Sequence, residues 1–363
     1  MASQNDMIAK ENNDILLKND PNNRTPAHVK HAPVLCSISL KAQVNYEKFL
    51  DILKDEFERK RESKITRPET LENFEILQMI GEESASVRIE AIIKSKTKKQ
   101  LLSEKRLLQA FHFPFVINLE FCFKDNNYIY MVMPFMIGGD LFSQLKRLGR
   151  FNENQAKFYA SQIILALEYL HHMGVIHRDL KLENILVDKN GYLKLTDFSF
   201  SKITDDRTAT FCGTPEYIAP EIIMGKTYGK AADWWSFGVL LYEMVSGHTP
   251  FYANDTMKLY EKIVQGKYKF DEHIGNDIKD LIRNILQTDP SRRYGNLYSG
   301  ILDYKHHRWF LGTNWTAMLN RKVEAPIIPK VKGPGDTIYF NKYHEVPLKI
   351  SPENQYEKEF EDF

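Results

Sequence analysis

Apolar residues at helical spacing dominate the sequence beyond Asp140, and this pattern is its strongest constraint on the fold. A period near 3.6 residues predicts helices that bury at least one face. The pattern recurs in four segments, residues 154–172, 230–245, 255–265 and 274–287. Two short apolar runs, residues 185–187 and 193–196, interrupt it and predict strands. This part of the chain is therefore predicted to form a mainly helical body.

The part before Asp140 carries strand patterns instead. Residues 74–80 and 128–133 are typical of strands, and residues 92–111 between them follow a helical period. A turn at residues 134–139, with two glycines, separates this part from the helical body. We therefore expect an α+β chain of two lobes, a small strand-bearing lobe followed by a large helical one.

Three further segments differ in composition from these lobes. Residues 1–40 are rich in Asn, Asp, Lys and Ser without a period, and we expect a mobile tail. Residues 45–63 predict an amphipathic helix that docks against the main body. Residues 311–363 carry prolines, glycines and scattered aromatic residues, which predicts an extended tail anchored on the surface. Residues 74–310 remain as the main domain.

Composition limits the classes of function. The 49 Lys and Arg residues nearly balance the 48 Asp and Glu residues, and a net charge of +1 gives no field that would attract nucleic acid. Three cysteines without metal-ligand spacing argue against a disulfide scaffold or a zinc site. No apolar run reaches the length of a transmembrane segment, and no signal peptide or myristoylation motif is seen. We expect a soluble cytoplasmic protein, with the nucleus as a second location.

The sequence HRDLKLEN at residues 177–184 concentrates the polar groups that phosphoryl transfer requires. Asp179 can accept or orient a substrate hydroxyl, and Lys181 can neutralise the migrating phosphoryl group. Asn184 can offer a neutral oxygen to a hard metal ion such as Mg²⁺. The alternative interpretation is a polar loop with a structural His-Arg pair.

A second acidic group follows at the end of a predicted short strand. Asp197, in the sequence DFS, would be a charged magnesium ligand that bridges the phosphates of a bound nucleotide. On its own this tripeptide is most often an ordinary turn. Its spacing from residues 177–184, and the sequence GTPEYIAPE at residues 213–221, make the signal strong.

These sets, HRDLxxxN, DF-x and APE, resemble the signatures of eukaryotic protein kinases. The match extends to the AGC group of serine/threonine kinases, and the chain closely resembles the catalytic subunits of cAMP-dependent protein kinases. It rests on CGTPEY at residues 212–217, DWW at 233–235, KVEAP at 322–326 and FEDF at 360–363. The resemblance runs from Glu104 to Phe363 without a visible gap. It implies a bilobal kinase fold that uses ATP and Mg²⁺.

The resemblance implies structural and regulatory roles at matching positions. Asp233 would brace the catalytic loop, and Glu221 would pair with Arg293. Thr210 matches an activation-loop phosphosite, and Ser351 matches a phosphosite in the C-terminal tail.

A phosphate on the activation loop adds about two negative charges and needs cationic partners. By the same resemblance, Arg178 and Lys202 stand at two of these partner positions. Gln100 replaces a histidine at the third.

Binding roles are implied in the same way. Three acidic residues match positions that read arginines upstream of the target hydroxyl: Asp140, Glu183 and Glu243. Solvated surface charge is the alternative interpretation of these acids. Met136 belongs to the hinge that binds adenine through its backbone, and Phe340 and Tyr343 match tail aromatics that close the nucleotide pocket.

The nucleotide-binding half departs from the kinase pattern. Of the kinase sequence GxGxxGxV, only the first glycine, Gly81, survives in the stretch GEESASVR. Glu83 replaces the second glycine, and a carboxylate near a triphosphate repels it unless the side chain turns outward. Ser199 stands where the family has glycine after Asp-Phe, and restricts the loop that carries Asp197.

A second departure concerns the lysine that should touch the phosphates. Glu104 matches the helix glutamate that pairs with this lysine, but it stands only 23 residues after Gly81. The intervening strands and connector would need about 15–25 residues before the helix begins. By the resemblance, residues 92–96 already match the segment that follows the lysine strand in the family. The family segment that carries the strand lysine is therefore missing from this chain, which predicts an open sheet edge. Lys94 could imitate the motif, although the alignment places it beyond the strand, and Arg88 is the other candidate cation.

Three interpretations follow. In the first, the chain is a working kinase in cAMP signalling that phosphorylates Arg-rich protein substrates, with Arg88 or Lys94 in place of the lost lysine. In the second, it is a pseudokinase that binds a cAMP-sensing regulatory subunit or basic substrates without phosphotransfer. In the third, the sequence lacks a segment that its gene encodes. The intact polar set at residues 177–184 favours a working kinase. Ala209 and His248 replace aromatic residues where the family meets its regulators, which weakens the expectation of a regulatory subunit.

Overall fold

The structure is a computed structural model, which describes part of the chain. The described residues are 40–63, 70–75, 80, 86–204, 207–341, 343, 348, 350–354 and 356–360. Most of the predicted N-terminal tail, most of the predicted strand at residues 74–80 and the predicted nucleotide contact Gly81 therefore lie outside the described residues.

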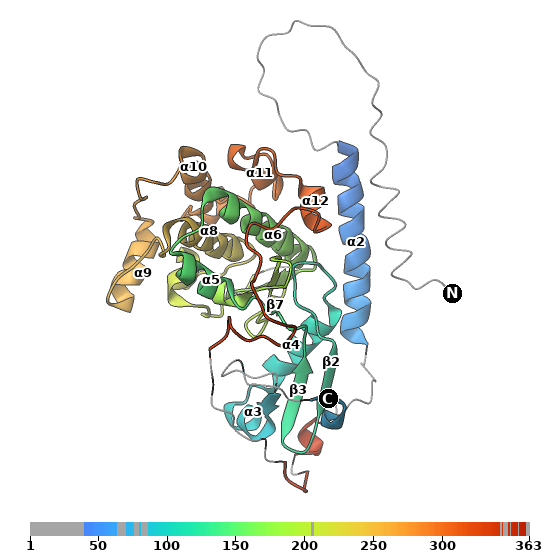
Figure 1. Cartoon of the computed structure of the whole chain (residues 1–363). Coiled ribbons are helices and arrows are strands. Elements are labelled where there is room, and N and C mark those ends of the chain that lie inside the picture. The colour runs from blue at the N-terminus through green and yellow to red at the C-terminus, as the bar shows by residue number, and fades with distance from the viewer. Residues whose placement is uncertain are drawn as a thin grey trace, which may run out of the picture. The chain divides into compact units, whose positions relative to one another are not determined.

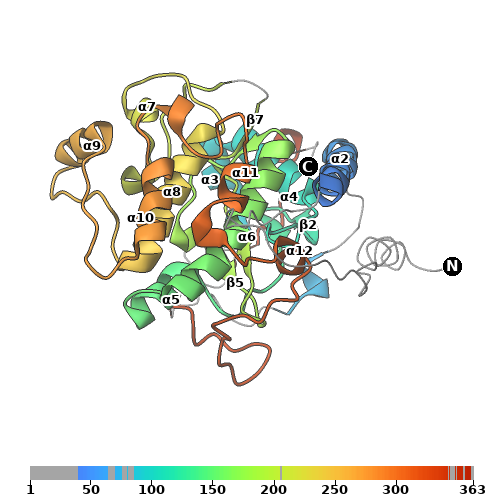
Figure 2. The same ribbon diagram turned by 90° about the horizontal axis from the view of Figure 1, so that it is seen from above.

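The larger lobe is built from helices, as the sequence predicts. Its longer helices are α5 (Leu141–Leu148), α6 (Glu153–His172), α8 (Ala231–Ser246), α9 (Thr256–Gln265) and α10 (Asn276–Ile285). Three short helices complete it: α7 (Pro220–Ile223), α11 (Leu302–Lys305) and α12 (Trp315–Leu319). Helix α8 packs between α6 and α10 (Figure 2). Both α6 and α8 are buried almost all round, which explains why their sequences lack a polar face.

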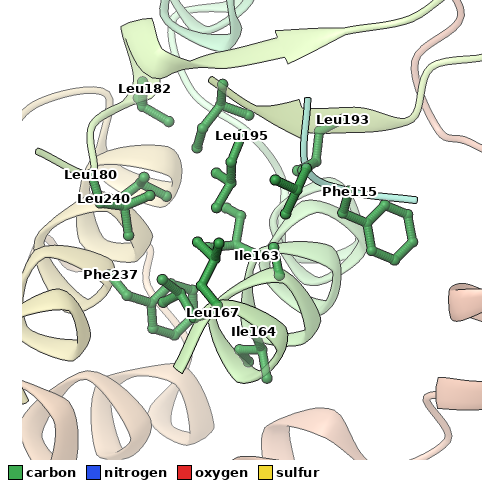
Figure 3. Close-up of a cluster of buried hydrophobic side chains, with 14 of the residues drawn as sticks. Phe115, Ile163, Ile164, Leu167, Leu180, Leu182, Leu193, Leu195, Phe237 and Leu240 are labelled. Atoms are coloured by element: carbon green, nitrogen blue, oxygen red, sulfur yellow. The ribbon is translucent and has the colours of Figure 1, made fainter. Parts of the chain in front are cut away.

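The core of this lobe supports the loop at residues 177–184 directly. Figure 3 shows Ile163 and Leu167 of α6 in a cluster with apolar side chains from α8 and from the short strands. Leu180 and Leu182, on either side of Lys181, are completely buried in this cluster. Because these two neighbours are fixed in the core, the backbone that carries Lys181 is held in one position.

Two pairs of short antiparallel strands carry the loops of the larger lobe. Strands β4 (Val175–Ile176) and β7 (Lys202–Ile203) form one pair. Strands β5 (Ile185–Val187) and β6 (Leu193–Leu195) form the other. The sequence therefore predicts β5 at its observed bounds and places β6 within one residue of its observed end.

The smaller lobe contains a three-stranded antiparallel sheet in the order β1-β3-β2. Its strands are β1 (Ser86–Arg88), β2 (Phe121–Lys124) and β3 (Tyr128–Val132). Asp125 closes the turn between β2 and β3, because its Oδ1 accepts hydrogen bonds from the backbone N–H groups of Asn127 and Tyr128 at 2.7 and 2.8 Å. Strand β3 lies in the middle of this sheet, and β1 and β2 form its two edges among the described residues.

Two helices, rather than the single one predicted at residues 92–111, follow β1. Helix α3 (Ile89–Ser95) ends at Lys96, which adopts a left-handed conformation with φ of 58°. Helix α4 (Lys98–Ala110) then begins after Thr97. A left-handed residue terminates a helix and redirects the chain, and the periodicity of the sequence does not reveal this break.

Helix α2 (Leu40–Glu62) confirms the predicted amphipathic helix and begins five residues before its predicted start. It packs against α4 and α6 (Figure 1). Its buried residues are Leu50, Leu53 and Phe57, at helical spacing. The Phe57 ring stacks on Phe111 at 5.7 Å between centroids. No helix in the described ranges is long and apolar enough to span a membrane.

The C-terminal segment is largely without regular structure after α12, and aromatic side chains anchor it. Phe340 stacks on Phe135, with ring centroids 5.4 Å apart. Phe135 belongs to residues 134–139, the inter-lobe segment. Further on, Phe360 is buried, and the Nζ of Lys98 in α4 lies 5.1 Å from its ring centroid. These contacts agree with the predicted extended tail.

Candidate active site

Asp233 holds the backbone of the loop at residues 177–184 in place. Its carboxylate accepts hydrogen bonds from the backbone N–H groups of His177 and Arg178, both at 2.9 Å, and contacts His171 Nε2 at 2.8 Å. Burial alone would raise the pKa of Asp233, but the hydrogen bond and charge of His171 hold it below its ordinary value. Arg178 has a positive φ of 72°, a strained conformation that these contacts stabilise. The predicted bracing role of Asp233 is confirmed.

Asp179 is buried at the centre of a small polar network. Its Oδ1 accepts hydrogen bonds from the backbone N–H and hydroxyl of Thr214, at 2.9 and 2.8 Å. Its Oδ2 lies 3.0 Å from Lys181 Nζ, which also donates to the Thr214 hydroxyl at 3.1 Å. Burial acts to raise the pKa of Asp179, but the bonds from Thr214 and Lys181 outweigh it and lower the pKa. Asp179 is therefore a carboxylate at neutral pH.

Asn184 joins this network to Asp197. The Asn184 Nδ2 donates to the backbone carbonyl of Asp179 at 2.9 Å and to Oδ2 of the same residue at 3.2 Å. It also donates to Asp197 Oδ2 at 3.3 Å. The structure thus brings together Asp179, Lys181, Asn184 and Asp197, the four residues that the sequence singles out. With its nitrogen engaged in this way, Asn184 keeps its amide oxygen as an available ligand.

The segment after β6 is anchored by aromatic packing. Asp197 itself has a left-handed backbone with φ of 60°. The next residue, Phe198, is buried, with its ring 4.6 Å from that of Phe111 and 5.1 Å from that of His177. This packing fixes the position from which the Asp197 carboxylate reaches Asn184.

The donor set fits magnesium in a nucleotide complex. Asp197 supplies a carboxylate and Asn184 an amide oxygen, the hard ligands that Mg²⁺ prefers. The described part of the chain holds no cluster of three or more acidic, histidine or cysteine side chains that would bind a metal alone. A metal ion here would therefore take its remaining ligands from nucleotide phosphates and water, as is usual for Mg²⁺.

The structure does not bring Lys94 to this site. It lies on α3, three-quarters exposed, and its Nζ pairs with Glu90 at 2.5 Å on the same helix. The structure thus contradicts the prediction that Lys94 takes the place of the strand lysine, because Lys94 belongs to a surface helix and not to a strand. Arg88 lies at the end of β1, with its guanidinium 5.9 Å from the Tyr128 ring centroid. That contact engages Arg88 with the sheet and not with the catalytic loop.

The other described residues predicted to bind the nucleotide are Glu104, Met136 and Phe340. Glu104 is a half-buried residue of α4. Met136 is buried, and its carbonyl accepts a hydrogen bond from Gly139 N–H at 3.0 Å. Phe340 of the tail stacks on Phe135 of the same segment. Met136 thus belongs to the inter-lobe segment, and Phe340 belongs to the tail that packs on this segment.

Two of the three predicted arginine-reading acids have perturbed pKa values. Desolvation raises the pKa of Glu183, and the charges of Asp140 and Asp179 add to this. Burial raises the pKa of Glu243 to about 7, and the charge of Glu183 contributes. The Tyr217 hydroxyl donates a hydrogen bond to the Glu243 carboxylate.

The third predicted acid, Asp140, has a structural role as well. It is the N-cap of α5, and its Oδ1 accepts a hydrogen bond from Ser143 N–H at 2.7 Å. The charge of Asp140 raises the pKa of Glu183, and the charge of Glu183 raises the pKa of Glu243. The three carboxylates therefore share one region of negative charge.

The activation segment presents Thr210 at the surface. The Tyr228 hydroxyl donates a hydrogen bond to the Thr210 carbonyl at 2.7 Å. The exposed Thr210 hydroxyl lies 3.5 Å from the Thr208 hydroxyl. Lys202 Nζ donates to the Thr208 hydroxyl at 3.0 Å. Arg178 Nη1 is buried and has no hydrogen-bond partner among the described residues.

Two further predictions concern the pair of Glu221 and Arg293 and the tail residue Ser351. Arg293 is fully buried, and it binds Glu221 through two hydrogen bonds of 2.8 and 2.9 Å, so the predicted pair is confirmed. Ser351 contacts the turn between β2 and β3, because its carbonyl accepts a hydrogen bond from Asn126 Nδ2 at 2.9 Å.

Three residues near the site carry interactions that the sequence reasoning did not assign. Thr214 binds both Asp179 and Lys181, and its position inside the GTPE sequence was the available signal. Ser199 donates to Asp197, and Gln100 of α4 donates to the Ser199 carbonyl at 2.7 Å. Neither of these last two contacts follows from a local pattern.

Comparisons with known proteins agree with this geometry. The protein kinase domain family matches residues 82–310, more than half of the chain. The human cAMP-dependent protein kinase catalytic subunit PRKX is 46% identical over 254 residues, which cover 70% of this chain and 71% of that protein. The cAMP-dependent protein kinase catalytic subunit 2 of Drosophila melanogaster is 38% identical over 340 residues, which cover 88% of this chain and 96% of that one.

A third relative is longer. The cAMP-dependent protein kinase catalytic subunit of Dictyostelium discoideum is 44% identical over 261 residues, which cover 72% of this chain but only 40% of that protein. The chain belongs to the protein kinase family and, within it, to the AGC serine/threonine kinases that resemble cAMP-dependent protein kinase catalytic subunits.

Proposed function

We propose that this chain transfers the γ-phosphate of ATP to serine or threonine hydroxyls of protein substrates that carry upstream arginines. The observation that supports this most directly is the meeting of Asp179, Lys181, Asn184 and Asp197 in one hydrogen-bonded cluster. A structural polar loop would not need a buried carboxylate, a cation and two hard metal ligands within contact of each other.

Each residue of the cluster has a role in the transfer. Asp179 is ionised and orients the substrate hydroxyl, taking its proton as the new oxygen–phosphorus bond forms. The bond from the γ-phosphorus to the bridging oxygen of ATP breaks in the same transfer, and ADP leaves with that oxygen. Lys181 lies beside Asp179 and stabilises the negative charge on the moving phosphoryl group. Asp197 and the amide oxygen of Asn184 would hold magnesium, which when bound neutralises the phosphate oxygens of ATP.

The small lobe makes this enzyme slower than a kinase with the complete pattern. We expect neither Lys94 nor Arg88 to replace the phosphate-binding lysine, because Lys94 pairs with Glu90 and Arg88 lies over the Tyr128 ring. Loss of one preorganised charge contact typically costs a factor of 10² to 10³ in rate, about 2.7–4 kcal/mol. We therefore expect measurable but weak phosphotransfer.

The substrate preference rests on the acids at the edge of the cluster. Asp140, Glu183 and Glu243 share one negative region, and arginine guanidinium groups bind carboxylates with paired hydrogen bonds. The proposed partners are accordingly basic protein substrates. A cAMP-binding regulatory subunit is a further proposed partner, supported only by the names of the relatives.

Phosphorylation of Thr210 is the proposed activating step. The exposed threonine lies beside Thr208, which Lys202 binds, and Arg178 has a buried nitrogen without a partner in the described residues. A phosphate on Thr210 would supply an acceptor for both cations. Ser351, held against the turn between β2 and β3, is the proposed second phosphosite.

A radiolabelled transfer assay tests the proposed function. The purified chain is incubated with Mg²⁺, labelled ATP and a peptide containing Arg-Arg-x-Ser, beside an Asp179→Ala variant. We expect incorporation into the peptide by the wild-type chain and at least about a hundredfold less by the variant. Equal incorporation by the two proteins would refute the proposal that this chain transfers phosphate with Asp179. Peptide binding without incorporation would instead support a binding module.

A further inference from the structure

Ser199 occupies one oxygen of the Asp197 carboxylate. The Ser199 hydroxyl donates a hydrogen bond to Asp197 Oδ1 at 2.6 Å. The backbone N–H of Ser199 donates to the same oxygen at 3.2 Å. Both donors belong to the residue that stands where the kinase signature has glycine, and glycine has no hydroxyl to offer.

The capacity of the carboxylate shows what this contact leaves free. Each carboxylate oxygen accepts about two hydrogen bonds or metal contacts through its lone pairs. The two donors of Ser199 fill Oδ1, and Asn184 Nδ2 takes one site on Oδ2 at 3.3 Å. One lone-pair site on Oδ2 therefore remains for a cation.

The conformation of Ser199 is fixed from several sides. Gln100 Nε2 of α4 donates to its carbonyl at 2.7 Å. The preceding residue, Phe198, is buried and hydrogen-bonds through its carbonyl to Ser201 N–H at 3.0 Å. Asp197 is held in its left-handed conformation. The hydroxyl consequently stays beside the carboxylate unless the segment rearranges.

From this geometry we propose that Ser199 is a positioning residue that limits Asp197 to a single divalent cation, bound through Oδ2. The inference rests on the proposed function, in which Asp197 and Asn184 hold the metal of a nucleotide complex. Kinases with glycine at this position hold two magnesium ions through the corresponding Asp and Asn. Here a second ion would have to displace the Ser199 hydroxyl from Oδ1, which weakens its binding.

Counting bound manganese tests the proposal without measuring catalysis. Mn²⁺ is titrated into the full chain with a saturating non-hydrolysable ATP analogue, and free Mn²⁺ is followed by electron paramagnetic resonance. We expect one Mn²⁺ per wild-type complex and two per Ser199→Ala complex. The second ion should bind Ser199→Ala at least about tenfold more tightly, since one charge-assisted hydrogen bond no longer competes. Ser199→Thr, which keeps the hydroxyl, should return the count to one.

Ser201→Ala is the matched control, because it removes a hydroxyl two residues away that donates to the His177 carbonyl at 3.2 Å and not to Asp197. This control should bind one Mn²⁺ like the wild type. Two ions in the wild type, or one in Ser199→Ala, would overturn the inference and leave the proposed function standing. If neither protein bound Mn²⁺ with the nucleotide, both the proposed function and the inference would fall. A thermal melt of each variant shows that it is folded before the count.

Discussion

At the scale of single residues, the carboxyl group of Glu243 responds to pH near neutrality. Burial raises its pKa to about 7, the hydrogen bond from Tyr217 opposes this, and the charge of Glu183 adds to it. Glu243 is therefore about half protonated at pH 7 and fully charged only above it. Since an arginine side chain binds a carboxylate much better than a neutral carboxylic acid, its binding should follow this titration.

We predict that the KM for an arginine-containing peptide falls as the pH rises from 6 to 8. The charged fraction of a group with a pKa of about 7 increases about tenfold between pH 6 and pH 8, so the change in KM should approach tenfold. The measurement is a KM profile against pH, with Glu243→Gln as the control that lacks the titration. A flat profile in the wild type would show that Glu243 does not read arginine.

The same pKa also sets the sign of a stability effect. The folded chain binds the Glu243 proton more tightly than the unfolded chain, whose ordinary pKa is near 4.5. The stabilisation from this proton is complete below pH 4.5 and is lost as the pH rises through about 7. Charging of Glu243 for substrate binding thus lowers the free energy of unfolding.

The proximity of the proposed catalytic residues could be predicted because they lie close together in the sequence. Asp179, Lys181 and Asn184 fall within one short motif, and the buried leucines between them fix their direction. The hydrogen bond from Ser199 to Asp197 could not be predicted, because it depends on the left-handed backbone of Asp197. For Lys94 the sequence pattern misleads, because the residues before it resemble those before a strand lysine, but they form helix α3 in the structure.

At the scale of elements, a line of aromatic rings connects α2 to the segment that carries Asp197, the proposed metal ligand. Phe57 of α2 stacks on Phe111 at the end of α4, and Phe111 packs against Phe198 beside Asp197. Phe57 and Phe198 are both buried, with about 1% of each side chain exposed. The docking of α2 therefore supports the position of a residue in the catalytic segment.

We predict that Phe57→Ala lowers the free energy of unfolding by about 3–4 kcal/mol, as is usual for a buried phenylalanine in a packed core. It should also weaken binding of the magnesium–nucleotide complex, because Phe111 and Phe198 lose their support. Ile52→Ala on the same helix is the control, since Ile52 is 65% exposed and should change stability by less than about 0.5 kcal/mol. Calorimetry and nucleotide titration measure the two effects. Equal losses in both variants would contradict this role of α2.

Elements differ in how far their sequences determine them. Helices α6 and α8 could be predicted to within one residue at nearly every end, because their apolar period is long and uninterrupted. Strand β1 could not be predicted, since its three residues become a strand only through pairing with β3. The break between α3 and α4 depends in turn on the left-handed conformation of Lys96.

At the scale of the whole described molecule, the C-terminal tail contacts each part of the kinase domain. Tyr339 lies against Arg147 of α5, with the guanidinium 4.6 Å from its ring centroid. Phe340 packs on the inter-lobe segment, and Ser351 contacts the turn between β2 and β3. The last described residues of the tail contact α4, where Lys98 donates to the Glu359 carbonyl beside the buried ring of Phe360. These contacts join the small lobe to the large one along a single segment.

We therefore predict that Phe360→Ala releases the end of the tail and raises the KM for ATP several-fold. The buried ring is the apolar anchor on α4, and its loss removes the burial energy that keeps the tail across the inter-lobe segment. Limited proteolysis should show faster cleavage of residues 336–360 in this variant. Ile338→Ala, which removes a side chain that is 61% exposed in the same tail, should leave both measurements unchanged. An unchanged KM with faster cleavage would mean that the tail docks without contributing to the nucleotide site.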